Sequence, residues 1–231
     1  MARHGYVGDN WPELSERIRS CLGPVDLQLT ASRGDGLRIG KEAIAKGART
    51  IVSFGGDGTH SEVVDGIMRS ELNREVSLGI LHAGTGGDFR RMIPGAEELE
   101  GACAVIREKP SVPIDIGWVQ YVHDEGRQDG RFFINITSMG MGGLVDRYVA
   151  ASKSKSGGKA KYFKAVLRAN AKYKPARIRL RIDGRDEGEH EISNICVCNG
   201  RWAGGSMMFA PDARVADGMF DIVLIRATST L

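Results

Sequence analysis

The sequence predicts an α/β N-terminal domain with a parallel sheet, followed by a mostly antiparallel β domain. In the first half, short apolar runs alternate with amphipathic stretches of helical period. Two of these runs end in glycine clusters, and from about residue 111 runs of strand-like pattern follow one another. A length of 231 residues suits two domains, so we place the domains at 1–110 and 111–231, with the boundary near residues 108–112.

The first domain is predicted to alternate helices with short strands. Residues 11–22 read as an amphipathic helix that has a proline at a tolerated early position, and 25–29 (VDLQL) alternates as a strand does. Further helices are expected over 36–48, 61–69 and 96–107, and further strands over 49–54 and 77–81. This alternation is typical of a parallel sheet with helical connections.

The second domain is predicted to be built mainly from strands. We expect strands over 112–122, 132–137, 176–182, 192–198 and 220–225, and one helix over 159–172. The run RIRLRI at 177–182 alternates strictly, which is typical of a half-exposed antiparallel strand. Residues 151–161 (ASKSKSGGKAK) are small, polar and basic, and we expect a mobile connection there, with a phosphate or lipid-headgroup contact as the alternative.

Composition limits the class of protein. The net charge of +3 is too small to predict nucleic-acid binding, and it is equally compatible with an anionic substrate, an anionic membrane surface or neither. The cysteines Cys21, Cys103, Cys196 and Cys198 lack metal-site spacing, so we expect reduced thiols in a cytosolic protein. The N-terminus has no signal-peptide core, and no 18-residue apolar run occurs, so we expect no membrane span.

The first glycine cluster lies in the stretch VSFGGDGTHSEVV at 52–64. A strand enters a glycine-rich turn and a helix leaves it, an arrangement whose converging amides bind anions. Thr59 and Glu62 have the spacing of a capping box, so starting a helix is an alternative role for them. The cluster is neither a dinucleotide fingerprint nor a P-loop, because neither motif is present.

The second glycine cluster, HAGTGGDF at 82–89, also follows an apolar strand. The carboxyl ends of parallel strands meet at one edge of the sheet, where ligands bind. Each cluster carries one Thr and one Asp, and paired carboxylates suit a divalent cation or general-base chemistry beside a polyphosphate. Arg90 and Arg91 follow and are assigned either to phosphate contact or to a solvated helix face.

These motifs together resemble the diacylglycerol kinase catalytic domain family, which includes bacterial lipid kinases and sphingosine kinases. The resemblance rests on GGDGT at 55–59 with the trailing EVVxG, on LGIL and GTGxDF over 78–89, and on VCNGRWxGG at 197–205. It continues through APxA at 210–213 and DGxxD at 217–221, so it covers nearly the whole chain. It implies an NAD kinase/diacylglycerol kinase-like fold with ATP bound between two domains.

The resemblance also implies site residues and partners. It assigns nucleotide contacts to Thr30, Gly55, Gly56, Asp57, Gly58, Thr59, His60, Ser61, Glu62, Gly84, Thr85, Gly86 and Asp88. It assigns a structural Mg²⁺ to the side chain of Asp217 and to backbone carbonyls of Arg214 and Met219, although the Asp217-Gly218 pair is equally typical of a hairpin turn. The implied activity is transfer of a phosphoryl group from ATP to diacylglycerol or a related lipid, in the cytoplasm or peripherally at the inner membrane face.

The chain also departs from the family pattern. It starts after the family's first strand and stops before the C-terminal segment that carries the proposed base, so we expect a second domain incomplete at its C-terminus and assign the base role to Asp57. An unpaired sheet edge makes a homodimer one alternative. Two other functions stay open: a small-molecule kinase of the NAD kinase type, and a nucleotide-binding protein without catalysis.

Overall fold

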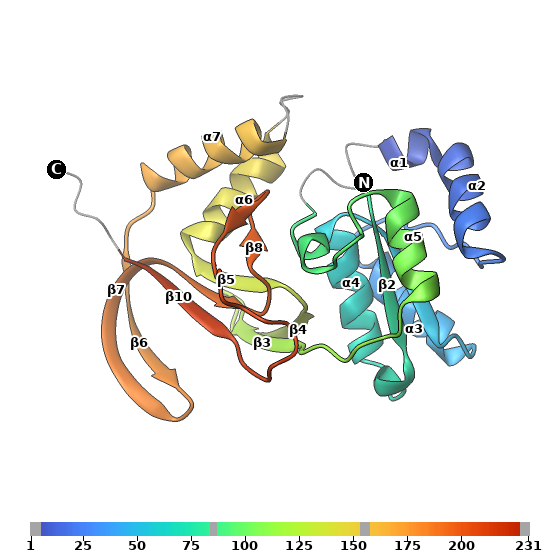
Figure 1. The fold of residues 1–231 in the computed structure, drawn as a ribbon. Coiled ribbons are helices and arrows are strands. Elements are labelled where there is room, and N and C mark those ends of the chain that lie inside the picture. Colours follow the sequence, from blue (N-terminus) through green and yellow to red (C-terminus); the bar gives the residue numbers. More distant parts are fainter. Residues whose placement is uncertain (1–5, 84–86, 153–157, 227–231) are drawn as a thin grey trace.

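The computed structural model describes residues 6–83, 87–152 and 158–226 (Figure 1). An N-terminal α/β lobe and a C-terminal lobe of mostly antiparallel strands lie side by side. This arrangement confirms the predicted fold class. None of the described helices is long and apolar enough to span a bilayer.

The N-terminal lobe contains a two-stranded parallel sheet, β1 (Thr50–Gly55) with β2 (Ser77–His82). In the register of this pair Gly55 lies opposite His82, so both strands end at the same edge, as predicted. The helices are α1 (Tyr6–Asp9), α2 (Trp11–Leu22), α3 (Asp35–Ala45), α4 (Asp57–Met68) and α5 (Leu99–Glu108), with short 3-10 turns at Asn73–Glu75 and Phe89–Met92.

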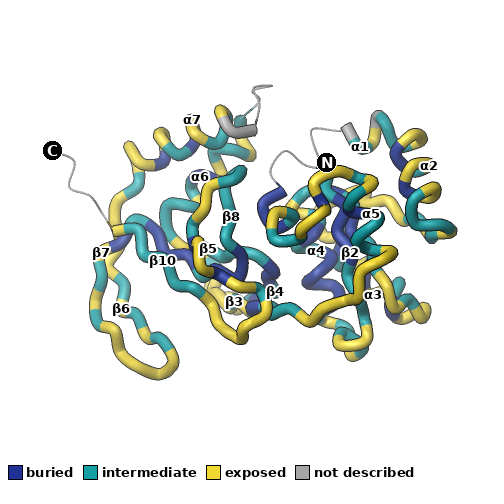
Figure 2. The backbone as a smooth tube through the Cα atoms, viewed as in Figure 1, coloured by how far each residue is buried: buried dark blue, intermediate teal, exposed yellow. Residues whose placement is uncertain are grey.

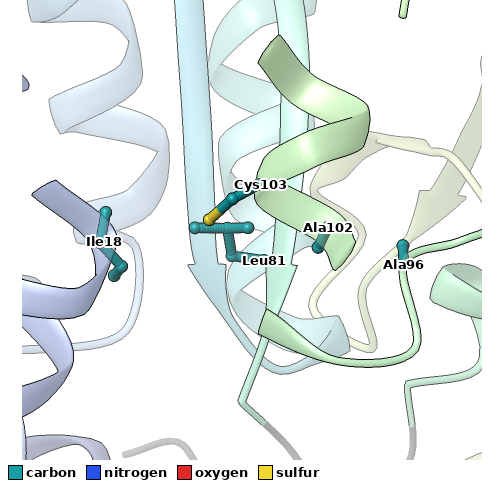
Figure 3. Close-up of a cluster of buried hydrophobic side chains, with 5 residues drawn as sticks. All are labelled: Ile18, Leu81, Ala96, Ala102 and Cys103. Carbon is teal, nitrogen blue, oxygen red and sulfur yellow. The ribbon is translucent and has the colours of Figure 1, made fainter. Parts of the chain in front are cut away.

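The core of this lobe forms where α2 and α5 pack on the sheet. Figure 3 shows Ile18 of α2 and Cys103 of α5 beside Leu81 of β2, with Ala96 and Ala102 completing the cluster. Leu81 is completely buried, because helices cover this face of the sheet. One apolar cluster therefore holds β2, α2 and α5 together, and Figure 2 shows β2 among the buried parts of the backbone.

The predicted strand at 25–29 is wrong. Side-chain burial there alternates over residues 25–27, but the segment pairs with no strand in the part of the chain that the structure describes. β1 uses one edge for β2: the carbonyls of Arg49 and Gly55 accept hydrogen bonds from the amides of Ser77 and Ala83, at 2.8 and 2.7 Å. Since a parallel ladder alternates, the polar backbone groups of residues 50, 52 and 54 face the opposite edge.

That open edge of β1 and the segment 24–33 together line a cavity of about 1400 Å³. The segment and the strand therefore both line this cavity, and no strand pairing joins them among the described residues. An alternating pattern predicts which residues face inward, but a strand also needs a hydrogen-bonded neighbour.

The C-terminal lobe holds a four-stranded antiparallel sheet in which β7 (Arg185–Cys198) pairs with every other strand. Its partners are β5 (Ile136–Gly140), β6 (Ala176–Ile182) and β10 (Asp221–Arg226). The other elements are the hairpin β3 (Gly117–Val122) and β4 (Gln128–Phe133), the short strands β8 (Trp202–Ala203) and β9 (Met207–Met208), and the helices α6 (Met141–Ala151) and α7 (Gly158–Asn170).

Several predictions fail in this lobe. The strand expected over 112–122 begins only at Gly117, and the connection expected over 151–161 overlaps the end of α6 and the start of α7. The single strand at 132–137 is two strands separated at residues 134–135, because Asn135 turns its polar groups to the neighbouring segment: its Nδ2 donates to the Trp202 carbonyl at 2.9 Å, and its carbonyl accepts from the amides of Asn199 and Gly200. Helix α6 was not predicted, because glycines at 140, 142 and 143 mask its helical pattern. The predicted free thiols are confirmed among the described residues.

Side chains of α4 connect the lobes. Asp65 is buried, and its Oδ1 accepts from Arg69 Nε at 2.8 Å and from the amide of Phe132 at 3.3 Å. Arg69 in turn donates to the carbonyl of Gly130 at 2.6 Å. The helix that starts at the first glycine cluster is therefore anchored to β4 by an ion pair between the buried Asp65 and the exposed Arg69, and by the hydrogen bonds of both residues.

Candidate active site

Helix α4 begins immediately after β1. Its N-cap is Gly56, in extended conformation (φ −99°, ψ 179°), and Asp57 is its first residue, four positions before the predicted start. The predicted Thr59 cap is wrong, because no side chain caps this helix and Thr59 already lies in its first turn. Thr59 packs against Gly55 instead: a Cβ on Gly55 would lie 2.7 Å from Thr59 Oγ1, so only glycine fits there.

Asp57 lies at this helix start and faces the second glycine cluster. The backbone amides of Gly87 and Phe89 donate hydrogen bonds to its carboxylate. The residue retains solvent-accessible surface, but the protein atoms around its carboxyl partly desolvate it. Burial, together with the nearby charge of Asp88, raises the pKa of Asp57, while His82 and the two amides oppose this shift. A carboxylate with a raised pKa is a better proton acceptor than an ordinary aspartate.

Asp88, the second predicted carboxylate, is buried and connects the two lobes. Its Oδ1 accepts from the amide of Ser206 at 2.8 Å and its Oδ2 from the amide of Gly205 at 2.9 Å. Both oxygens thus bind the turn between β8 and β9. The structure therefore brings Asp57 and Asp88 close together, as predicted, but gives Asp88 a direct role in positioning the second lobe.

His60 lies on the interior side of α4. Its ring is buried, and its Nδ1 forms a 2.8 Å hydrogen bond with Ser53 Oγ of β1. The His82 ring follows at 5.9 Å between centroids. Burial, and secondarily the charge of His82, lowers the pKa of His60 to about 3, so His60 is neutral at physiological pH. His60 is not among the residues that line the cavity, and a nucleotide contact by its imidazole stays a prediction.

Glu62 organises the wall of the cavity. Its carboxylate accepts from the amides of Gly34 at 2.9 Å and Gly36 at 3.1 Å, the first amides of α3. In the same loop Asp35 Oδ2 accepts from the amides of Ala31 and Ser32. Glu62 therefore does not form the predicted capping box within its own helix, because it satisfies the free amides of another helix start. Together these hydrogen bonds fix the conformation of the loop at 31–36, which follows Thr30.

Six of the thirteen predicted nucleotide residues line the cavity, whereas Gly55, Asp57, His60 and Asp88 do not. It is lined by Thr30 and by Gly56, Gly58, Thr59, Ser61 and Glu62 of the first cluster. No described atom lies within 4 Å of a Cβ built on Gly58, so the backbone there is open to close approach. The contacts predicted for Gly84, Thr85 and Gly86 fall on residues that lie outside the described ones.

The residues predicted to bind Mg²⁺ lie in the second lobe, apart from the cavity. Asp217 is exposed, and its Oδ1 accepts from the amide of Met219 at 3.1 Å. The adjacent Gly218 has φ 76° and donates to Asp115 Oδ2 at 2.8 Å. This is the turn geometry expected of an Asp-Gly pair, and the described residues contain no group of three or more His, Cys, Asp or Glu side chains that could hold a metal. The metal role of Arg214, Asp217 and Met219 stays a prediction.

Asp115 and Asn199 support this turn. The sequence did not identify Asp115 as a candidate site residue. Asn199 is fully buried, and its Nδ2 donates to the carbonyls of Asp115 at 2.8 Å and Ile134 at 2.7 Å. The signal available in the sequence was the single acidic residue in the apolar stretch VPIDIG at 112–117. Its carboxylate reaches the amide of Gly218 only because of long-range folding.

The two arginines after the second cluster are occupied by the protein itself. Arg90 donates to the carbonyls of Ala96 and Glu97, at 3.3 and 2.8 Å. Arg91 donates to Ser206 Oγ at 2.6 Å and lies 5.5 Å from the ring centre of Trp202. Both arginines therefore bond to the protein itself, and Arg91 also remains exposed to solvent.

Comparison with known proteins agrees with these motifs. Residues 3–119 match the diacylglycerol kinase catalytic domain, and residues 135–231 match the YegS C-terminal NAD kinase beta sandwich-like domain. A probable lipid kinase YegS-like of Chromohalobacter salexigens is 30% identical over 242 residues, which cover 98% of this chain and 74% of the relative. The diacylglycerol kinase of Bacillus subtilis is 33% identical over 202 residues, or 85% of this chain and 61% of that protein.

Solved structures share the fold. A putative diacylglycerol kinase from Bacillus anthracis superposes with a TM-score of 0.75 at 24% identity, covering 98% of this chain and 73% of that chain. The chain spans between 61% and 74% of the lengths of these proteins. The superposition shows that the chain shares the fold of these structures.

Proposed function

Because the chain belongs to the diacylglycerol kinase catalytic domain family, we propose that it is an ATP-dependent lipid kinase that transfers the γ-phosphoryl group of ATP to a lipid hydroxyl. The observation that carries the proposal is the position of Asp57. It stands at the start of α4, at the common end of two parallel strands, and beside a cavity lined by the same helix start.

The cavity suits a nucleotide polyphosphate. Gly56 and Gly58 leave room for phosphate oxygens near the backbone, and the positive end of the α4 dipole favours negative charge there. The hydroxyls of Thr30 and Thr59 stand on the same lining and can donate hydrogen bonds. These residues would bind and orient ATP, which is most of what phosphoryl transfer needs from a protein.

The donor set also suits Mg²⁺ at two places. Carboxylate oxygens are preferred Mg²⁺ ligands, and Asp57 beside the cavity and the pair Asp115 and Asp217 in the second lobe provide them. Asp57 would hold Mg²⁺ at the first place, where the ion would neutralise charge on the transferred phosphoryl group. In the second lobe these carboxylates already accept hydrogen bonds from the 217–219 turn, so an ion bound there would have a structural role.

Asp57 is assigned the proton transfer. The amides of Gly87 and Phe89 hold its carboxylate in place, and burial raises its pKa, so an oxygen of Asp57 can accept the proton of an incoming lipid hydroxyl. The hydrogen bonds of Asp88 to the β8–β9 turn hold the second lobe against this site.

The test measures transfer of radiolabelled phosphate from ATP, with Mg²⁺, to a panel of diacylglycerol, monoacylglycerol and sphingosine in detergent micelles, and to NAD. We expect labelled lipid from the wild-type chain and none from Asp57→Asn, with ATP binding retained in the variant. Transfer to NAD alone would support a small-molecule kinase. ATP binding without transfer to any acceptor would contradict the proposal and support a non-catalytic nucleotide-binding role.

A further inference from the structure

Strand β1 is covered on both faces but is open along one edge. Val52 and Phe54 pack into the apolar cluster that joins β2, α2 and α5. On the other face of the strand, Ile51 packs with Ile44 of α3 and Val63 of α4. The strand therefore lies between two apolar layers, as a strand inside a parallel sheet does.

The cavity at the open edge of β1 is lined by helices from both of these layers. Ile18 and Leu22 of α2 line it, and so do Ile39 and Ala43 of α3. Apolar walls favour an occupant with an apolar surface. The cavity therefore resembles the space between the helices of an α/β sheet, which a further strand normally fills.

The backbone that borders this cavity has unpaired hydrogen-bonding groups. On β1 the amides and carbonyls of Thr50, Val52 and Phe54 face the open edge, because the intervening residues bond to β2. Residues 25–29 also line the cavity, and among the described residues no hydrogen bond involves a backbone group of this segment. Backbone groups in protein interiors are almost always paired, so both stretches lack the partner that folding normally supplies.

An extended peptide backbone is the ligand that matches these groups. They repeat at every second residue, about 7 Å apart, along the six residues of β1. A second strand repeats its own amides and carbonyls at the same spacing, whereas a nucleotide or a hydrocarbon chain would leave most of them unpaired. Because apolar layers lie on both sides, such a strand should be apolar at consecutive positions rather than at alternate ones.

We propose that the cavity takes an extended peptide of about six mostly β-branched apolar residues, which pairs with the open edge of β1 as an added strand. The occupant is a separate peptide rather than β1 of a second copy, because that edge of a second copy is recessed between its own helices. Gly56 and Gly58 follow the end of β1, so the end of the cavity proposed for phosphate remains available to a nucleotide. The inference goes beyond the proposed function and does not depend on it, since strand pairing uses neither ATP nor lipid.

The experiment measures the fluorescence anisotropy of a labelled peptide that has a core of about six valines and isoleucines and lysines at both ends. The peptide is mixed with the full chain in the absence of ATP and lipid, and we expect saturable binding. Two control peptides carry N-methyl groups on alternate core residues, one peptide for each register. Each should bind at least about tenfold more weakly, because N-methylation removes amide donors but no apolar surface. Equal affinity of all three peptides would overturn the proposal, since the cavity would then accept any apolar ligand.

Hydrogen exchange followed by NMR locates the bound peptide. The amides of Thr50, Val52 and Phe54 should exchange at least about tenfold more slowly when the peptide is bound. The amides of Ile51 and Ser53 already bond to β2 and should change less. Equal slowing of all five amides, or no slowing, would overturn the assignment of the peptide to this edge.

A variant of the cavity wall tests the same site from the side of the protein. Leu27 is half-buried and lines the cavity, and Leu27→Asp should weaken peptide binding at least about tenfold, because the peptide would desolvate the new carboxylate. The matched control is Leu167→Asp, since Leu167 is 55% exposed on α7 and does not line the cavity. This control should bind the peptide as wild type does, and circular dichroism should show that both variants are folded.

Three further outcomes would overturn the proposal. Wild-type affinity in a folded Leu27→Asp variant would place the peptide elsewhere. Displacement of the peptide by ATP would place it at the nucleotide end of the cavity rather than along β1. Self-association of the chain without peptide binding, lost in Leu27→Asp, would assign the cavity to a second copy. Peptide binding without kinase activity would leave this inference standing and count against the proposed function alone.

Discussion

Replacing Gly58 by alanine should change the stability of the protein and its proposed affinity for ATP in opposite directions. A Cβ at Gly58 meets no described atom within 4 Å, whereas a Cβ at Gly55 would lie 2.7 and 2.8 Å from Thr59 Oγ1 and Cβ. Alanine at the second residue of α4 should therefore be tolerated, and should stabilise the protein by roughly 0.5 kcal/mol, at the low end of the glycine-to-alanine range. For a chain of this size such a change raises Tm by about 1–2 °C.

The same methyl group would project into the cavity, where we propose that phosphate approaches the backbone. We expect Gly58→Ala to weaken ATP binding at least tenfold, or about 1.4 kcal/mol, in isothermal titration calorimetry. The matched control is Gly143→Ala, because Gly143 is also exposed, lies in the first turn of α6 and has no described atom within 4 Å of a Cβ. It should raise Tm similarly and leave ATP binding unchanged. Gly55→Ala should instead cost about 1–3 kcal/mol of stability through overpacking. Wild-type ATP affinity in Gly58→Ala would refute the assignment of the cavity to the nucleotide.

Three further predictions follow from the site. Asp57→Asn should abolish turnover and raise Tm at neutral pH, since burial raises the pKa of Asp57 and an ionised carboxyl there opposes folding; a lower Tm by calorimetry would contradict this. Because the pKa of His60 falls from 6.5 to about 3, the unfolded chain binds a proton below pH 6.5 that the folded chain does not, and stability should drop by about 3 kcal/mol between pH 6.5 and about pH 4. Urea melts should show a flatter pH profile for His60→Gln, and an unchanged profile would disprove the burial argument. Asn199→Ala leaves two carbonyls without their buried donor and should cost about 2–4 kcal/mol, whereas a cost below about 1 kcal/mol in the same melts would show that water replaces the amide.

Local sequence patterns predicted the bounds of a helix or strand correctly where the folded protein gave that segment the neighbours its pattern requires. Strand β6 and helix α2 have the predicted bounds, because one alternates strictly and the other has a proline-marked start and a glycine after its end. The segment 25–29 has an equally good strand pattern and forms no strand, because no described neighbour pairs with it. Helix α6 shows the converse, since it forms despite two glycines in its first turn, where it follows β5 and packs on α7.

Within the candidate site, the sequence by itself determined the chemistry. The glycine clusters and their aspartates fix which groups can approach a phosphate, because backbone freedom and charge are properties of the residues themselves. Only the tertiary structure decided how these groups are used. It turned Asp57 toward the amides of Gly87 and Phe89 and gave both oxygens of Asp88 to the second lobe. It also sent Glu62 to the start of α3. The reason is that buried polar groups take whichever partner folding brings within hydrogen-bond distance, and those partners lie up to 118 positions away along the chain.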